Sequence, residues 1–150
     1  MAIGRLYPHQ SLKNNPQTML EQDYIMRLVR EFFEALELFM LRREAVEVKA
    51  ERLQTLYNQY VGPAEFYRTA EMSDVMQSFE RFDQHERLHR MEMLAELYYV
   101  DADLHTGPQR QHLLSQSLQL FRFIDRHSGV YSFDRLNKIN RLERALTEKE

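Results

Sequence analysis

The sequence predicts an all-α protein, and three observations indicate this class. Glycine and proline are rare, with four residues of each among 150, which disfavours folds that need many tight turns. Leu, Glu, Arg, Gln, Met and Ala dominate, and these residues have high helix propensity. Apolar residues recur at steps of three and four, and no segment alternates convincingly as a strand. We therefore expect an antiparallel bundle or array of about five to six helices, with a single helical domain over residues 18–150.

The first half of the chain contains an arm and two predicted helices. Residues 1–17 include Pro8 and Pro16 and show no periodicity, so we expect a flexible N-terminal arm. A long helix should begin near Met19 and end near Arg43. Its apolar positions are Leu20, Tyr24, Ile25, Leu28, Val29, Phe32, Phe33, Leu36, Phe39 and Met40. A second helix should cover residues 45–60, because Gly62 and Pro63 follow it as a stop signal.

The second half predicts four more helical segments. Residues 63–72 are ambiguous and are assigned at most one short turn. Ser73 and Asp74 should open a short helix through residue 82, and Asp83 should open the next one, to about residue 104. The sequence "HTGP" ends that helix, and a further helix is expected over residues 109–127. Ser132 then caps a last helix over residues 133–147.

Two segments of this half form a weak repeat. "ERLHRMEMLAEL" at residues 86–97 aligns with "DRLNKINRLERA" at residues 134–145, forty-eight positions later. A helix pair followed by a similar helix is typical of helical repeats, so we expect a tetratricopeptide-like C-terminal part, although the period exceeds that of the tetratricopeptide repeat.

The amino-acid composition and the net charge disfavour several classes of function. The absence of cysteine removes disulfides, thiolate catalysis and thiolate zinc sites, and fits a cytoplasmic protein. A net charge of −3 gives no electrostatic reason to expect nucleic acid as a partner. We expect no signal peptide and no membrane span, because the longest apolar-looking segment is interrupted by charges. Those charges are Arg27, Arg30, Glu31, Glu34 and Glu37.

One pentapeptide carries a catalytic pattern. Residues 85–89 read His-Glu-Arg-Leu-His, which matches the H-E-x-x-H motif of zinc peptidases. In that motif the two histidines, one helical turn apart, bind zinc, and the glutamate acts as general base on the metal-bound water. The pattern would make His85 and His89 metal ligands and Glu86 the base.

Several observations argue against a zinc peptidase. No third ligand is evident, although Glu92, Glu96, Asp101 and His105 are available, and Arg87 places a charge between the histidines. The predicted fold also has no sheet edge for a peptide substrate. At 100° per residue the histidines share a polar, solvated stripe with Glu92, Glu96 and Asp103. Glu86 follows Asp83 by three residues, which is the spacing of a capping box. In the second copy of the repeat, Phe133 and Asn137 occupy the positions of His85 and His89, so neither possible metal ligand is present there.

Other candidate residues carry weaker patterns. Asp101, Asp103 and His105 resemble a ligand cluster but should be solvated at a helix end. His112 and His127 flank the fifth helix, and His127 suits its C-terminal dipole. Ser115 and Ser117 have no neighbouring base or glycine-rich elbow, and no phosphate-binding or dinucleotide-binding loop is present. We therefore expect no cofactor.

A resemblance rests on residues 21–31, "EQDYIMRLVRE". They are similar to the opening of a family of small uncharacterised bacterial proteins that begin with E-Q-D-Y-I-M-R-[LI]-[IV]-[KR]-E. "LYNQYVG" at residues 56–62 and "LAELYY" at residues 94–99 are also similar in kind. The resemblance implies a helical, repeat-like fold without known catalytic residues. The extra arm before Met19 departs from the family pattern.

The leading functional hypothesis is a non-enzymatic scaffold or protein–protein interaction module that associates with itself. The apolar face of the first helix is wider than one antiparallel neighbour requires, so we expect it at or near a homodimer interface. The expected interaction residues are Tyr24, Ile25, Leu28, Phe32, Leu36 and Phe39. A second layer of the same chain could instead cover this face. The main alternative is a zinc-dependent hydrolase that uses His85, His89 and Glu86. A peripheral membrane role is disfavoured because the helix lacks a lysine-rich polar face.

Overall fold

The computed structural model describes residues 16–148, and the predicted all-α class is confirmed: these residues form helices and no strand. The long helices are α2 (Pro16–Leu41), α3 (Val46–Tyr60), α6 (Gln84–Asp101), α7 (Gly107–His127) and α8 (Phe133–Thr147). The short segments are α4 (Ala64–Thr69), α5 (Met72–Ser78), and the 3₁₀ turns η1 (Phe79–Arg81) and η2 (Ala102–Leu104). Residues 1–15 of the expected arm lie outside the described residues, whereas residues 16 and 17 belong to α2.

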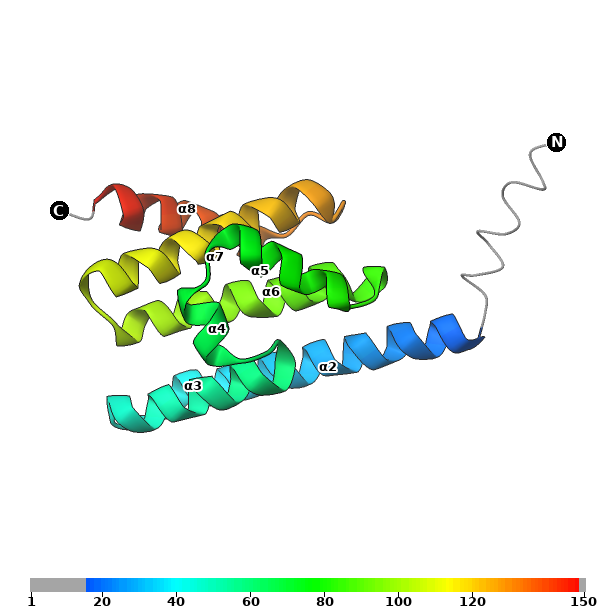
Figure 1. Cartoon of the computed structure of the whole chain (residues 1–150), viewed down its shortest axis with the longest axis horizontal. Helices are drawn as coiled ribbons and strands as arrows, with labels where there is room; N and C mark the ends of the chain where they lie inside the picture. Colours follow the sequence, from blue (N-terminus) through cyan, green and yellow to red (C-terminus); the bar gives the residue numbers. More distant parts are fainter. Residues whose placement is uncertain (1–15, 149–150) are drawn as a thin grey trace.

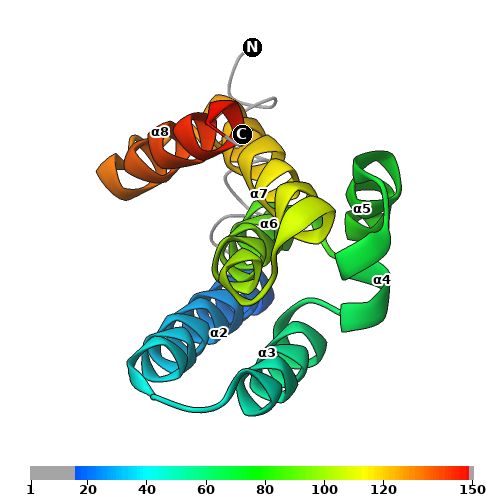
Figure 2. The same ribbon diagram turned by 90° about the vertical axis from the view of Figure 1, so that its left-hand side faces the viewer.

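The helices form two antiparallel groups that meet at α6. One group is the pair α2–α3, and the other is the succession α6, α7 and α8, in which each helix packs on the next (Figures 1 and 2). Helix α6 contacts α2, α3 and α7 and is therefore the central element. The short helices α4 and α5 connect the two groups along one side of the array (Figure 2).

The segment that was expected to be at most one short turn contains a helix. Pro63 precedes α4 and suits a helix start because its φ is fixed. The helix is held by Tyr67, which is completely buried and whose hydroxyl lies 2.8 Å from the Ser78 hydroxyl. Helix α5 starts at Met72 and not at Ser73–Asp74, because the carbonyl of Glu71 already accepts from the amide of Asp74 at 3.0 Å. A six-residue helix of this kind depends on tertiary packing, which local periodicity does not report.

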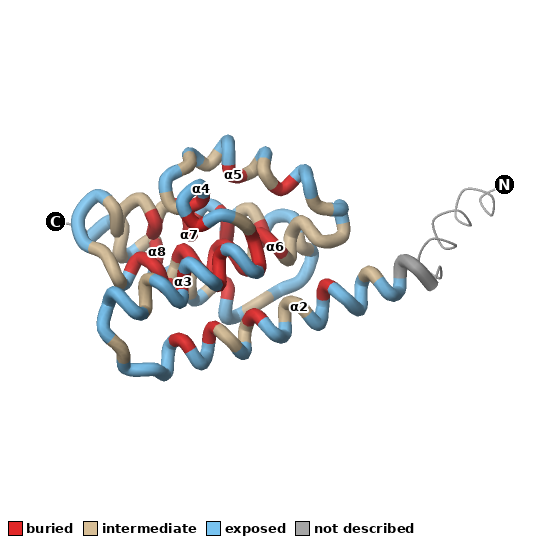
Figure 3. The backbone as a smooth tube through the Cα atoms, turned by 60° about the horizontal axis from the view of Figure 1, so that its bottom comes forward, coloured by how far each residue is buried: buried red, intermediate tan, exposed pale blue. Residues whose placement is uncertain are grey.

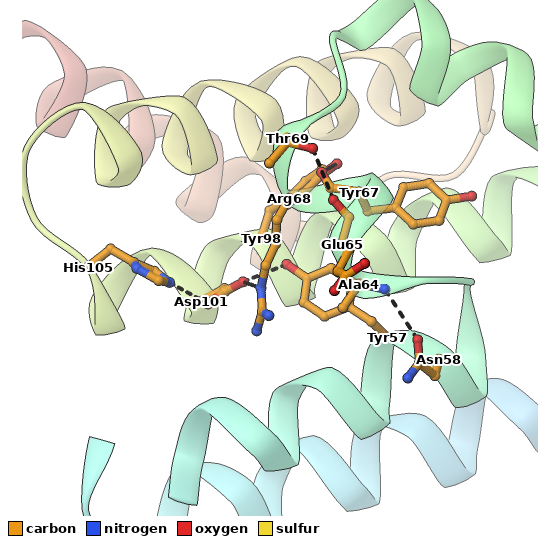
Figure 4. A network of polar contacts seen from close by, with 10 residues as sticks. All are labelled: Tyr57, Asn58, Ala64, Glu65, Tyr67, Arg68, Thr69, Tyr98, Asp101 and His105. Atoms are coloured by element: carbon orange, nitrogen blue, oxygen red, sulfur yellow. Dashed lines mark hydrogen bonds and ion pairs between the residues drawn. The ribbon is translucent and has the colours of Figure 1, made fainter. Parts of the chain in front are cut away.

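A buried carboxylate joins α3, α4 and α6 (Figure 4). Asp101 is fully buried, and its Oδ2 accepts from the Tyr57 hydroxyl and from Nε of Arg68, both at 2.8 Å. Its Oδ1 lies 3.1 Å from Nε2 of His105. Burial, followed by the nearby charge of Asp101, raises the pKa of Tyr57 well above its usual value, so this hydroxyl remains a donor.

The expectation that Asp101 is solvated is therefore wrong. Its two partners on other helices precede it by 33 and 44 residues, so sequence spacing did not reveal them. Asp103 matches the expectation: its side chain is 75% exposed and lies 3.3 Å from Arg110. The predicted cluster of three thus separates into buried Asp101 with its half-buried partner His105, and an exposed carboxylate.

Two isosteric substitutions test the role of this carboxylate. Asp101→Asn should lower the free energy of unfolding by about 3 kcal/mol, because it leaves the guanidinium of Arg68 without its buried counter-ion. Asp103→Asn is the matched control, and we expect a change within about 0.5 kcal/mol because that carboxylate is exposed. Urea denaturation followed by circular dichroism measures both values. Equal effects of the two substitutions would contradict a structural role specific to Asp101.

Candidate functional site

The H-E-x-x-H pentapeptide lies in the first two turns of α6, where all five of its residues are partly buried. The carboxylate of Glu86 is engaged, since its Oε1 lies 3.1 Å from Nη2 of Arg90. Arg90 is itself buried and donates to the Tyr60 carbonyl at 2.5 Å, which ties α6 to the end of α3. A general base has to be free to accept a proton, and in this structure Glu86 is the counter-ion of a packing arginine.

The capping-box prediction for the same residues is wrong. Asp83 does occupy the N-cap position of α6, but its side chain accepts no capping hydrogen bond. The amide of Glu86 bonds instead to the Asp83 carbonyl at 2.8 Å. Arg90, one turn further along, holds the Glu86 carboxylate that a capping box would direct back to residue 83.

The Asp83 carboxylate belongs to a different cluster. One possible ligand atom from each of Glu21, Asp83 and His85 lies within 4.8 Å of the other two, and within residues 16–148 no other three candidate metal ligands converge in this way. Glu21 comes from the first turns of α2, so the cluster joins the start of α2 to the start of α6. Nε2 of His85 is buried and has no hydrogen-bond partner among the described residues. His89 does not belong to the cluster.

The predicted polar stripe of α6 is only partly solvated. Glu96 is 3% exposed, and both of its oxygens accept from Nζ of Lys138 on α8, at 2.8 and 2.9 Å. The expectation of a solvated stripe is therefore wrong at this position, because Lys138 of α8 reaches Glu96 and pairs with it. Burial raises the pKa of Glu92 and of Glu96, and the charge of Lys138 opposes that shift. Glu96 is consequently committed to an ion pair and is not placed as a third ligand for His85 and His89.

The remaining candidates have structural partners or exposed positions. The Ser117 hydroxyl is buried and donates to the Ala95 carbonyl at 2.9 Å, and the Ser115 hydroxyl accepts from Gln119 at 3.2 Å. His127 is exposed, and its ring stacks on Phe123 with centroids 4.1 Å apart. Nε2 of His112 is buried and has no partner among the described residues.

The expected interaction surface lies largely in the core of the chain itself. Ile25, Phe32, Leu36 and Phe39 are at most 6% exposed, and buried positions alternate with exposed ones along α2 (Figure 3). Leu28 is half-buried, and Tyr24 is 48% exposed. Four of the six residues expected at or near an interface are therefore buried within the chain, because α3 and α6 cover that face of α2. The alternative, a covering layer of the same chain, holds for them.

A different stripe of α2 remains uncovered. Met19, Met26 and Met40 are 52%, 45% and 60% exposed, and they occur with half-buried Phe33 at a spacing of seven residues. Val29, also half-buried, lies between Met26 and Phe33 on the same side of the helix. We call residues 19, 26, 29, 33 and 40 the outer stripe. A seven-residue period does not separate this stripe from the core face in the sequence, because buried Ile25, Phe32 and Phe39 also recur every seven residues.

Comparisons with protein-family models, with curated proteins and with solved structures find no match. None of the helices within residues 16–148 combines the length and the apolar character needed to cross a bilayer.

The free energy of unfolding should depend on pH through the protonation of His89. Burial, followed by the neighbouring His85, lowers the pKa of His89 below 6.5, so the unfolded chain binds a proton at this residue more readily than the folded chain. The stabilising contribution is present above pH 6.5 and is lost as the pH falls towards the lowered pKa. His89→Gln should therefore have a flatter stability curve than the native chain between about pH 7.5 and about pH 5.5. Parallel curves in urea denaturation would contradict the lowered pKa.

Metal titration distinguishes the cluster from the peptidase motif. Binding of Zn²⁺ at the start of α6 should depend on residues 21, 83 and 85, because these are the possible ligands that converge there among the described residues. Asp83→Asn should weaken zinc binding measured by calorimetry, and His89→Gln should not. The opposite result, loss with His89→Gln and retention with Asp83→Asn, would show that the H-E-x-x-H pair is the ligand set.

Proposed function

We propose that this chain is a non-enzymatic helical interaction module that associates with itself through α2. The observation that carries the proposal is the distribution of exposed apolar side chains. Thirteen large hydrophobic residues in the described part of the chain are exposed, and seven of them lie on α2. These seven are Met19, Leu20, Tyr24, Met26, Leu38, Met40 and Leu41. Apolar surface concentrated on one element is typical of a protein–protein contact.

The position of α2 supports an intermolecular role. The N-terminal end of α2 extends beyond the neighbouring helices (Figure 1), and Met19, Leu20 and Tyr24 in its first turns are exposed. Burying apolar side chains of this size yields roughly 25 cal/mol per Å², and a partner is the available means of burying them. The partner is a second copy or another protein. Nucleic acid is disfavoured by the net charge of −3, and the absence of cysteine fits the cytoplasm.

The weak sequence repeat is compatible with this class of protein. Arg87 on α6 donates to the carbonyl of Phe82 at 3.0 Å, and its counterpart Arg135 on α8 donates to the carbonyl of Val130 at 2.5 Å. Each arginine therefore reaches back five residues and fastens the loop that precedes its helix. This shared local arrangement supports the tetratricopeptide-like character proposed for the C-terminal part, whose usual role is to present helices to other proteins.

A zinc-dependent hydrolase is the second candidate function. The unpartnered Nε2 of His85 favours it, because a buried imidazole nitrogen without a hydrogen bond is compatible with a ligand. The ion pair between Glu86 and Arg90 opposes it, since Glu86 would have to leave Arg90 before it could act as the base. We therefore place the interaction module first.

Light scattering coupled to size exclusion tests self-association. At tens of micromolar the native chain should have twice its single-chain mass. Met26→Glu should be monomeric, because it places a charge in the exposed apolar surface of α2, while its circular dichroism remains helical. Tyr131→Glu is the matched control: this residue is 67% exposed but lies between α7 and α8, and the variant should remain dimeric. A monomeric native chain would contradict the proposal.

A further inference from the structure

We infer that the partner on α2 is the same helix of a second copy, packed antiparallel along the outer stripe. This inference rests on the proposed self-association and specifies its geometry. The stripe recurs every seven residues, and that period is the one that lets two α-helices stay in contact along their length. A second copy has the same stripe, so in a dimer with two-fold symmetry the same residues form both sides of the contact.

The outer stripe is accessible on the side of α2 that no other described helix covers. Helix α3 lies against the opposite flank, where Leu38 and Thr55 help to line a hollow of about 240 Å³ between the two helices. Viewed along the array, α2 lies at its edge, with α3 on one side only (Figure 2). Val29 and Phe33 pack partly against the core, so the stripe continues the core surface outwards. A partner helix placed there would extend the existing α3–α2 layer by one helix.

The charged residues beside the stripe favour a second copy of the chain, rather than an unrelated helix, as the partner. Asp23, Arg30 and Glu37 each follow a stripe residue by four positions and are therefore neighbours of it on the helix surface. All three are exposed, and within residues 16–148 none of them belongs to an ion pair. Their signs alternate along the helix, so the row is complementary to its own reversed copy when the two are offset correctly.

The charges also select the register. A two-fold axis between residues 27 and 28 places Met26 beside Val29 of the other copy, and Asp23 beside Arg30 of the other copy. This register overlaps residues 16–39 of each helix, about 36 Å at 1.5 Å per residue. A slide of one heptad would instead oppose Arg30 to Arg30 and Asp23 to Glu37, and it would shorten the overlap to residues 21–41. Like charges in opposition are destabilising, so the first register is the one we propose.

Cysteine cross-linking tests the orientation, because the native chain has no cysteine. Met26→Cys and Met40→Cys replace two exposed residues of the same stripe. In the antiparallel pair residue 26 lies close to its own copy, whereas residue 40, just beyond the overlap of residues 16–39, lies far from its copy. A short bis-maleimide should therefore link Met26→Cys into dimers and leave Met40→Cys unlinked. Gln77→Cys, exposed on α5, measures the background of chance collisions.

Charge exchange tests the register. Asp23→Arg and Arg30→Asp should each weaken the dimer at least tenfold in sedimentation equilibrium, and the double variant should recover most of the native affinity. Efficient linking of Met40→Cys would overturn the antiparallel orientation. If the chain is dimeric by light scattering but Met26→Cys is not linked, the outer stripe is not the contact surface, although the chain still associates with itself. Failure of the double variant to recover affinity would overturn the register. A monomeric native chain would overturn both the inference and the proposed function.

Discussion

The carboxylate of Asp101 is the point at which three helices of this chain are joined. It is fully buried and accepts from Tyr57 on α3 and Arg68 on α4, while its own backbone ends α6. A buried charge is tolerated only when its oxygens are satisfied, so α3, α4 and α6 can come together only in the arrangement that supplies these donors. Because the turn between α2 and α3 is short, the position of α3 also determines the position of α2. That position leaves one edge of α2 uncovered.

Helix α6 shows how the residues of a catalytic pattern can be engaged in packing contacts. The same first turns that spell H-E-x-x-H also have to dock against α2 and α3. Glu86 serves that docking through Arg90 and the Tyr60 carbonyl, and Asp83 and His85 meet Glu21 of α2. The residues of the motif therefore take part in two separate contacts: Glu86 in the contact with α3 and His85 in the contact with α2. Spacing along one helix predicts which side chains are neighbours, but only the packing partner determines what each side chain does.

Much of the fold could be predicted from the sequence because helix periodicity is a local property. The five long helices follow from apolar spacing and from the stop signals at Gly62–Pro63 and Gly107–Pro108. Helix α4 was missed because six residues are too few for a period, and its stability comes from the burial of Tyr67. The partners of Asp101 and Glu96 were missed because they are distant in sequence. On α2 the broad apolar face was recognised, but its division into a core face and the outer stripe depends on where α3 and α6 lie.

The central claim is that the outer stripe of α2 is covered by a second copy of the chain. Hydrogen–deuterium exchange at two protein concentrations, one well above and one well below the dissociation constant of the dimer, tests it most directly. The claim predicts that amides in the first turns of α2 exchange more slowly at the high concentration, because helix fraying is suppressed when the partner packs there. Amides of α7, which lies away from the stripe, should exchange equally at both concentrations. Exchange in α2 that does not change with concentration would contradict the claim.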